Sequence, residues 1–148
     1  MTAGETGVCT LGLWHLGSVV SASLAQKGYR VTRSDPDQDR VRSLAQGVPP
    51  LHEPALPELI QAGLASGRLS FTNDLPKALA GARFVLLTFD TPVDDEDRAD
   101  LSGIFTAAAQ LAEPMEDGAT VIVMSQIPVG ACEEIRTAIS RACPRRRF

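Results

Sequence analysis

The chain has 148 residues, of which 44% are hydrophobic and 22% are charged, as is typical of one globular domain with its own core. Its formal net charge of -4 argues against a general nucleic-acid binder, which would present a basic face to the phosphates. The charge is uneven, because residues 141–148 contain four arginines and no acid. This basic tail fits a disordered end, a truncation scar or a segment that binds a partner.

The cysteines and histidines do not form a metal-binding pattern. Cys9, Cys132 and Cys143 lack metal-ligand spacing, and His15 and His52 are far apart in the sequence. We expect Cys9 to be a small core residue and both histidines to have surface or turn-packing roles. No segment approaches the roughly 20 apolar residues of a membrane span, and no signal peptide is recognisable. The protein is therefore expected to be cytoplasmic, with neither nucleic acid nor membrane as a partner.

Short apolar runs alternate with segments of helical period along the chain. In chain order, we expect a strand over 7–11, a helix between Gly17 and Gly28, a strand over 29–34 and a helix over 37–45. A proline-rich loop over 48–54 is then followed by a helix over 55–66, a strand over 69–72, a brief helix ending at 79 and a strand over 84–89. After a solvated acidic loop over 90–100, we expect a helix over 101–113, a strand over 120–124 and a helix over about 130–141.

Local signals predict where several of these helices begin and end. Asp37, and either Asn73 or Asp74, can cap the helices that follow them, because their side-chain oxygens accept hydrogen bonds from free backbone N–H groups. Gly28 and Gly47 are suited to end helices, because glycine adopts the left-handed conformation that closes the last turn.

The order of the elements predicts the fold class. Residues 84–89 and 120–124 are apolar almost throughout, as expected of strands covered on both faces. Strands that alternate with helices predict a doubly wound parallel sheet, a Rossmann-like α/β fold in a single domain. A chain that starts on the central strand would give the strand order 3-2-1-4-5. An unpaired strand near the C-terminus could pair with another chain, which predicts a homo-oligomer.

The turn after the first strand resembles a dinucleotide-binding fingerprint. Residues 12–17 read Gly-Leu-Trp-His-Leu-Gly and join a buried strand to a helix. Gly12 allows a tight turn, Gly17 allows close packing of the helix on the sheet, and the helix N-terminus favours a pyrophosphate. Asp35 ends the second strand, where a carboxylate can bind a ribose 2′-OH, which favours NAD over NADP.

Trp14 occupies the middle position of this turn, where the fingerprint has a glycine that lets the backbone approach the pyrophosphate. The indole must point away, fill the space of the phosphate or demand a longer approach. In the alternative interpretation, Trp14 packs as a hydrophobic lid and the turn is only a connection between strand and helix. The turn alone leaves both interpretations open.

Motifs spread along the chain resemble one family. They are Asp35-Pro36-Asp37 with the helix that follows, Glu53-Pro54-Ala55-Leu56-Pro57, Gly67-Arg68-Leu69, Thr91-Pro92, Ala99-Asp100-Leu101-Ser102 and Ser125-Gln126-Ile127-Pro128. Over roughly residues 7–140, they resemble the NAD-binding N-terminal domain of the UDP-glucose/GDP-mannose dehydrogenases, with 141–148 left as the basic tail. The resemblance implies a parent enzyme that oxidises the C6 alcohol of a nucleotide sugar to a carboxylate. Two NAD molecules are then reduced, and the second oxidation passes through a cysteine thioester.

The resemblance also assigns cofactor contacts. These would come from Gly12, Leu13, Trp14, Leu16, Gly17, Asp35, Arg40, Thr91 and Gln126. Asp35 and Arg40 would face the adenosine ribose, and Thr91 matches the threonine of the family's Thr-Pro loop. Three positions depart from the family pattern: Trp14 replaces the central glycine, Asp90 replaces the glycine before Thr-Pro, and Gln126 replaces a threonine.

No catalytic residue and no metal ligand is assigned. The family's catalytic cysteine, and the lysine and asparagine that assist it, lie beyond the part matched, so the chain is expected to be a truncated form that does not catalyse the oxidation alone. Two hypotheses follow: an NAD-binding domain of a nucleotide-sugar dehydrogenase, or a non-catalytic binding or scaffold protein with a degenerate cofactor site. A third, a hydroxyacyl-type dehydrogenase, is disfavoured by Glu53-Pro54 and by residues 99–102.

Overall fold

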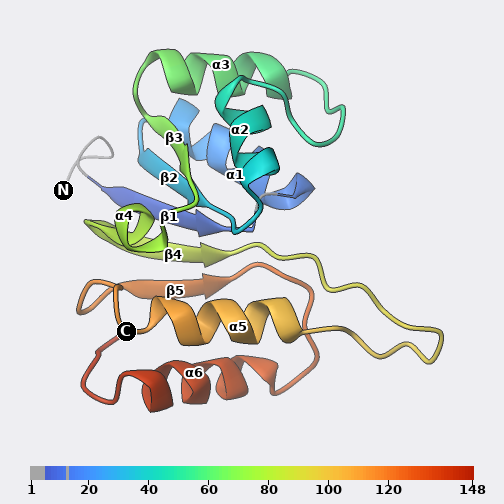
Figure 1. The fold of residues 1–148 in the computed structure, drawn as a ribbon, viewed down its shortest axis with the longest axis vertical. Coiled ribbons are helices and arrows are strands. Elements are labelled where there is room, and N and C mark those ends of the chain that lie inside the picture. The colour runs from blue at the N-terminus through green and yellow to red at the C-terminus, as the bar shows by residue number, and fades with distance from the viewer. Residues whose placement is uncertain (1–5, 13) are drawn as a thin grey trace.

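The structure is a computed structural model that describes residues 6–12 and 14–148. Its strands are β1 (Gly7–Leu11), β2 (Arg30–Ser34), β3 (Leu69–Thr72), β4 (Ala82–Leu87) and β5 (Thr120–Val123). They form one parallel sheet in the order β3-β2-β1-β4-β5 (Figure 1). The first described strand, β1, therefore lies at the centre of the sheet, and the strand order considered from the sequence is confirmed.

Helices cover both faces of the sheet. They are α1 (His15–Gln26), α2 (Gln38–Ala45), α3 (Leu56–Ala65), α4 (Leu75–Leu79), α5 (Ser102–Leu111) and α6 (Ala131–Ala142). The first three pack with one core cluster, whereas α4, α5 and α6 pack with a second cluster on the opposite face. In Figure 1, α3 lies at the top of the view, α1 and α2 lie next to β2 and β3, and α5 and α6 lie at the bottom, below β5. The predicted doubly wound α/β fold is confirmed.

The central strand β1 shows how two faces become core. Its side chains alternate, so Cys9 and Leu11 join the cluster of α5 and α6 while Val8 joins that of α1 and α3. Cys9 has no exposed surface, and its burial raises the pKa of the thiol to about 12. The predicted core role of Cys9 is confirmed.

The predicted helix caps explain where two helices begin. Oδ1 of Asp37 accepts the backbone N–H groups of Asp39 (3.0 Å) and Arg40 (3.2 Å) at the start of α2. Asp74, rather than Asn73, caps α4 by accepting the N–H of Lys77 at 3.1 Å. Helix α1 begins two residues before Gly17, so that the second glycine of the turn lies within its first turn.

The edge strand β5 is less buried than its apolar sequence predicts. Val121 and Val123 pack against the core, but Ile122 is 39% exposed and Met124, just after the strand, is 37% exposed. In the described sheet, β5 pairs with β4 alone, and α5 and α6 cover only the face of the two valines. The prediction that residues 120–124 are covered on both faces is wrong.

The basic tail folds back onto the loop between α5 and β5. The Arg147 side chain donates from Nε to Oδ2 of Asp117 at 2.9 Å, and its backbone N–H donates to Oδ1 at 3.0 Å. The N–H of Gly118 donates to the Arg147 carbonyl at 2.8 Å, and Arg146 donates to the carbonyl of Glu113. The side-chain and backbone hydrogen bonds from Arg147 lower the pKa of Asp117. The interpretation as a disordered end is therefore wrong for Arg146 and Arg147.

Candidate functional site

A pocket of about 290 Å³ opens where β1, β2 and β4 end. Its lining residues are Gly12, Trp14, Asp35, Arg40, Phe89 and Asp90. The chain leaves β1 toward β2 but leaves β4 toward β5, so the pocket lies at the point where the strand order reverses. Doubly wound sheets bind their ligands at such switch points, outside the carboxyl ends of the strands. The position of this pocket therefore marks it as the candidate site.

Two glycines let the β1–α1 turn lie against the end of β4. Gly12 has a left-handed φ of +95°, and a Cβ atom there would lie 3.0 Å from the Thr88 carbonyl. A Cβ atom on Gly17 would lie 2.2 Å from the Gly12 carbonyl oxygen and 2.5 Å from Oγ1 of Thr88. Neither position accommodates a side chain without movement of its neighbours. The two glycines thus allow the turn and α1 to pack closely against the end of β4, and Gly12 brings a residue without a side chain to the pocket.

Asp35 is held at the rim of the pocket, directly after β2. It is 6% exposed, and its Oδ1 accepts the backbone N–H of Asp37 at 2.8 Å. The turn that caps α2 therefore also orients the Asp35 carboxylate. A carboxylate at this position is suited to accept hydrogen bonds from the hydroxyl groups of a ribose.

Trp14 and Arg40 form a wall of the same pocket. The Arg40 guanidinium lies 5.2 Å from the centroid of the Trp14 ring, a cation–π contact, and its Nε lies 3.2 Å from Oδ2 of Asp37. Trp14 is half-buried and lines the pocket. The indole therefore does not point away from the site.

The other predicted contacts lie elsewhere or outside the described residues. Thr91 and Gln126 meet each other: Oγ1 of Thr91 donates to the Gln126 carbonyl at 2.6 Å, which ties the loop after β4 to the loop after β5. Neither residue lines the pocket, nor does Leu16, which is exposed at the start of α1. Leu13 lies outside the described residues.

Two contacts at the turn could not be predicted from the sequence. His15, the first residue of α1, bonds through Nε2 to Oε2 of Glu53 at 2.9 Å. This links the turn to the proline-rich loop, and only the fold brings these residues together. The second contact is made by Arg33 of β2, which has no exposed surface and donates to the Gly12 carbonyl at 2.8 Å. Burial lowers the pKa of the Arg33 guanidinium to about 9, while the charge of Asp35 acts in the opposite direction.

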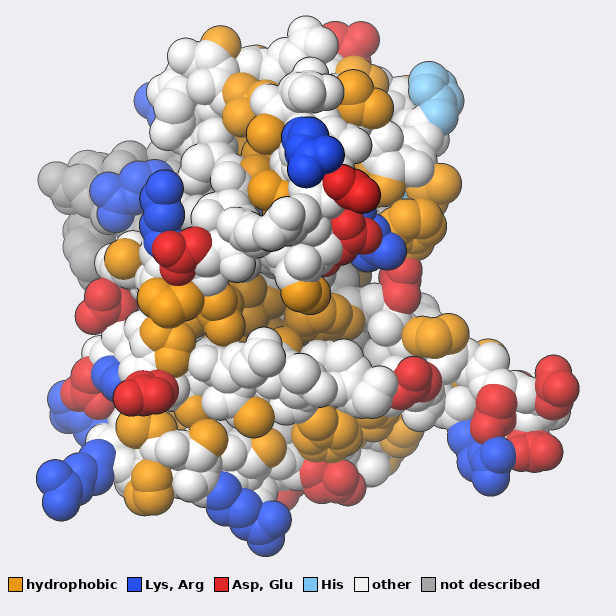
Figure 2. Space-filling model, viewed as in Figure 1, with side chains coloured by type: hydrophobic (Ala, Val, Ile, Leu, Met, Phe, Trp, Pro, Cys, Tyr) orange, Lys and Arg blue, Asp and Glu red, His pale blue; other side chains and the backbone are white. Residues whose placement is uncertain are grey.

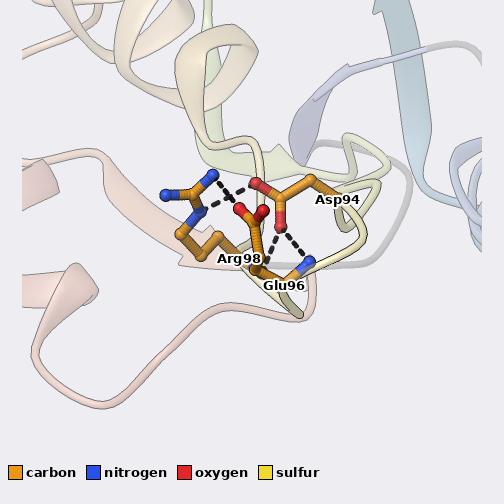
Figure 3. Close-up of polar contacts among 3 residues, drawn as sticks. All are labelled: Asp94, Glu96 and Arg98. Carbon is orange, nitrogen blue, oxygen red and sulfur yellow. Dashed lines mark hydrogen bonds and ion pairs between the residues drawn. The ribbon is translucent and has the colours of Figure 1, made fainter.

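The acidic segment 90–100 forms an ordered arm next to the pocket. A bridge between Val93 and Ala99 pairs its two sides. Asp94 organises the tip: its Oδ1 accepts the backbone N–H groups of Glu96 and Arg98, and Nε of Arg98 donates to its Oδ2 at 2.8 Å (Figure 3). The hydrogen bonds from Arg98 lower the pKa of Asp94. Figure 2 shows the charged side chains gathered at this projecting tip, solvated as predicted.

In the described part of the chain, no group of three or more His, Cys, Asp or Glu side chains is placed to hold a metal ion. Among the same residues, no helix has the length and apolarity to span a membrane. Cys9, Cys132 and Cys143 are all free thiols.

Sequence comparison relates residues 6–148 to the model described as the UDP-glucose/GDP-mannose dehydrogenase family, NAD binding domain. The UDP-glucose 6-dehydrogenase of Pseudomonas aeruginosa is 33% identical over 140 residues, which are 95% of this chain and 31% of that protein. The UDP-glucose 6-dehydrogenase of Rhizobium meliloti is also 33% identical, over 138 residues, 93% of this chain and 32% of that protein. The chain thus spans about a third of the length of these relatives.

Comparison with solved structures points to the same family. A UDP-glucose dehydrogenase from the archaeon Pyrobaculum islandicum superposes with a TM-score of 0.90 at 28% identity, over 99% of this chain and 35% of that one. A GDP-mannose dehydrogenase from Pseudomonas aeruginosa, solved as a ternary complex, gives a TM-score of 0.87 at 27% identity, over 94% and 33%. With its sheet order, its glycine turn and this match over nearly the whole sequence, the chain belongs to the UDP-glucose/GDP-mannose dehydrogenase family and corresponds to its NAD-binding domain.

Proposed function

We propose that the pocket at the ends of β1, β2 and β4 binds NAD, and that the chain is the cofactor domain of a nucleotide-sugar 6-dehydrogenase. One observation carries this assignment: a left-handed glycine, Gly12, and a rim carboxylate, Asp35, border the same pocket at the switch point of the sheet. The family to which the chain belongs supports the choice of NAD as the ligand.

The pocket residues suit the parts of a dinucleotide. Asp35 and Arg40 would hold the adenosine ribose, and the backbone at Gly12 with the N-terminus of α1 would hold the pyrophosphate. When bound, NAD supplies a hydride acceptor for the oxidation of an alcohol. The remaining contacts that we propose, on the family resemblance, are those of Leu13, Trp14, Leu16, Gly17, Thr91 and Gln126. Thr91 and Gln126 would act as the tied pair of loops.

The oxidation itself requires more than these residues. Cys9 is buried in β1, and Cys132 and Cys143 lie at the two ends of α6, outside the pocket. We therefore propose a longer protein that oxidises the C6 alcohol of a nucleotide sugar to a carboxylate, with this chain supplying cofactor binding. Three free thiols fit a reducing compartment, so we place the protein in the cytoplasm.

Asp90 and Trp14 favour a second candidate function, that of a non-catalytic binding or scaffold protein. The Asp90 carboxylate lines the pocket and would repel a pyrophosphate, and the Trp14–Arg40 wall occupies the place where the fingerprint has only glycine. Under this alternative, the fold is retained while the affinity for NAD is lost.

Calorimetric titration with NAD separates the two functions. The wild-type protein is expected to bind NAD saturably, and the double variant Trp14→Gly/Asp90→Gly more tightly. Loss of the Asp90 charge alone should tighten binding about fivefold, which corresponds to about 1 kcal/mol. Asp95→Gly, on the exposed arm outside the pocket, is the matched control and should leave affinity unchanged. No heat from wild type at millimolar NAD, with binding restored in the double variant, would establish the scaffold function instead.

The open edge of β5 leads us to propose a homo-oligomer. An unpaired edge strand offers N–H and C=O groups to another chain, and the exposed Ile122 adds apolar surface next to it. Sedimentation is expected to show an average mass that rises with protein concentration. Ile122→Lys should shift the population toward the monomer, because a charge at an edge opposes pairing. A monomer at every concentration would contradict this proposal.

A further inference from the structure

Arg33 is a charged side chain placed in the interior, beneath the turn that borders the pocket. It has no exposed surface, and it lies on β2 beside Thr10 of β1. Arginine is almost never fully buried unless other groups compensate for the lost hydration of its charge. An apolar residue would fill this strand position at a lower desolvation cost, so the contacts of Arg33 must account for the buried charge.

The contacts of Arg33 converge on the turn. Nη2 donates to the Gly12 carbonyl at 2.8 Å, and Nη1 donates to Oγ of Ser18 in the first turn of α1 at 3.1 Å. The guanidinium also lies 5.7 Å from the centroid of the Phe71 ring. Among the described residues, its Nε has no hydrogen-bond partner. The guanidinium thus clamps the end of β1 to the start of α1.

The Gly12 carbonyl is directed into the protein by this clamp. Oγ1 of Thr88 lies 3.0 Å from the same carbonyl oxygen and 2.9 Å from the Leu11 carbonyl oxygen, so its one hydroxyl hydrogen is shared between them. Both Thr88 and Arg33 have no exposed surface. An oxygen that accepts from the buried Arg33 and lies against the buried Thr88 hydroxyl points to the interior and away from solvent. A carbonyl oxygen is the negative end of the peptide dipole, so its direction decides whether the turn attracts or repels an anion.

We propose that Arg33 is a positioning residue of the cofactor pocket, which holds the Gly12 carbonyl inward and sets a positive charge beneath the turn. This rests on the proposed function, since the pyrophosphate of NAD is the group whose binding the inward carbonyl and the positive charge would favour. The charge of Arg33 also interacts with that of Asp35 at the pocket rim. Arg33 should therefore matter for ligands that carry phosphates and little for adenosine alone.

The binding experiment compares NAD with adenosine by calorimetry. Arg33→Met is expected to weaken NAD binding about tenfold or more, and adenosine binding by less than about threefold. Arg33→Lys keeps the charge but not the two-pronged clamp, and should fall between wild type and Arg33→Met. Arg30→Met, on the same strand but exposed, is the matched control and should bind both ligands as wild type does.

A second measurement follows the turn without any ligand. Trp14 is the only tryptophan of the chain and lies in this turn, so its fluorescence emission and its quenching by acrylamide report the local conformation. Both should change in Arg33→Met and Arg33→Lys at temperatures where circular dichroism shows each variant folded. They should stay unchanged in Arg30→Met.

The outcomes separate the two proposals. If wild type does not bind NAD, the proposed function fails, and the Trp14 signal still decides whether Arg33 holds the turn. Unchanged Trp14 emission in a folded Arg33 variant would overturn the positioning role, as would equal losses of NAD and adenosine affinity. Should Arg33→Met not fold, Arg33→Lys decides by the same two measurements.

Discussion

Replacement of Asp35 by alanine is expected to weaken the binding of NAD about thirtyfold, a loss of about 2 kcal/mol. The carboxylate lies at the pocket rim, is almost fully buried, and is oriented by the N–H of Asp37. A hydrogen bond to a charged group contributes about 1.5–3 kcal/mol, and the ribose would lose such a bond in the variant. Calorimetric titration of wild type and variant with NAD measures the difference.

Titration with NADP provides a second test of Asp35, because its carboxylate should repel the 2′-phosphate of that ligand. Asp35→Ala is expected to reduce the preference for NAD over NADP as well as the affinity for NAD. Asp39→Ala, on the exposed surface of α2, is the matched control, since Asp39 pairs with Arg42 outside the pocket. Equal affinity for NAD in wild type and Asp35→Ala would remove Asp35 from the cofactor site.

Replacement of Gly17 by alanine is expected to lower the free energy of unfolding by about 2–3 kcal/mol. The added Cβ would lie 2.2 Å from the Gly12 carbonyl oxygen and 2.6 Å from Nη2 of Arg33. These neighbours belong to the fixed turn and its buried clamp, so the helix must move away from the sheet to relieve the overlap. Urea denaturation followed by circular dichroism measures the loss.

Gly103→Ala is the matched control for this variant. Gly103 also lies in the first turn of a helix, α5, but its added Cβ would have Phe89 as its nearest neighbour, at an ordinary 3.7 Å. Alanine favours a helix over glycine by up to about 1 kcal/mol, so this variant should be neutral or slightly more stable. A Gly17→Ala protein as stable as wild type would show that α1 does not need its close approach to the sheet.

The elements and their order could be predicted because each rests on a local pattern. Apolar runs predict β1 and β4, side-chain caps such as Asp37 and Asp74 predict helix starts, and the handedness of crossovers restricts the arrangement. Neighbouring residues specify these features, so one sequence suffices. The same reasoning brings Gly12 and Asp35 to one pocket, since parallel strands end at one edge of the sheet.

Contacts between distant segments could not be predicted in this way. The pairing of His15 with Glu53 depends on how the proline-rich loop lies, and the burial of Arg33 depends on its acceptors in β1 and α1. Without knowledge of these acceptors, an arginine in a strand is predicted to lie on a solvent-exposed face of the sheet. The exposure of Ile122 has a related cause: its apolar neighbours predict coverage, but coverage requires a helix or strand beyond β5 that the described residues do not supply.

The docked tail places the end of the chain on the side of the sheet that is opposite to the pocket. Asp117 and Gly118 precede β5, so Arg147 is held at the amino ends of the strands, whereas the pocket lies at their carboxyl ends (Figure 1). The chain end is therefore separated from the level of the pocket by the length of β5, which is about 13 Å for four residues of extended chain.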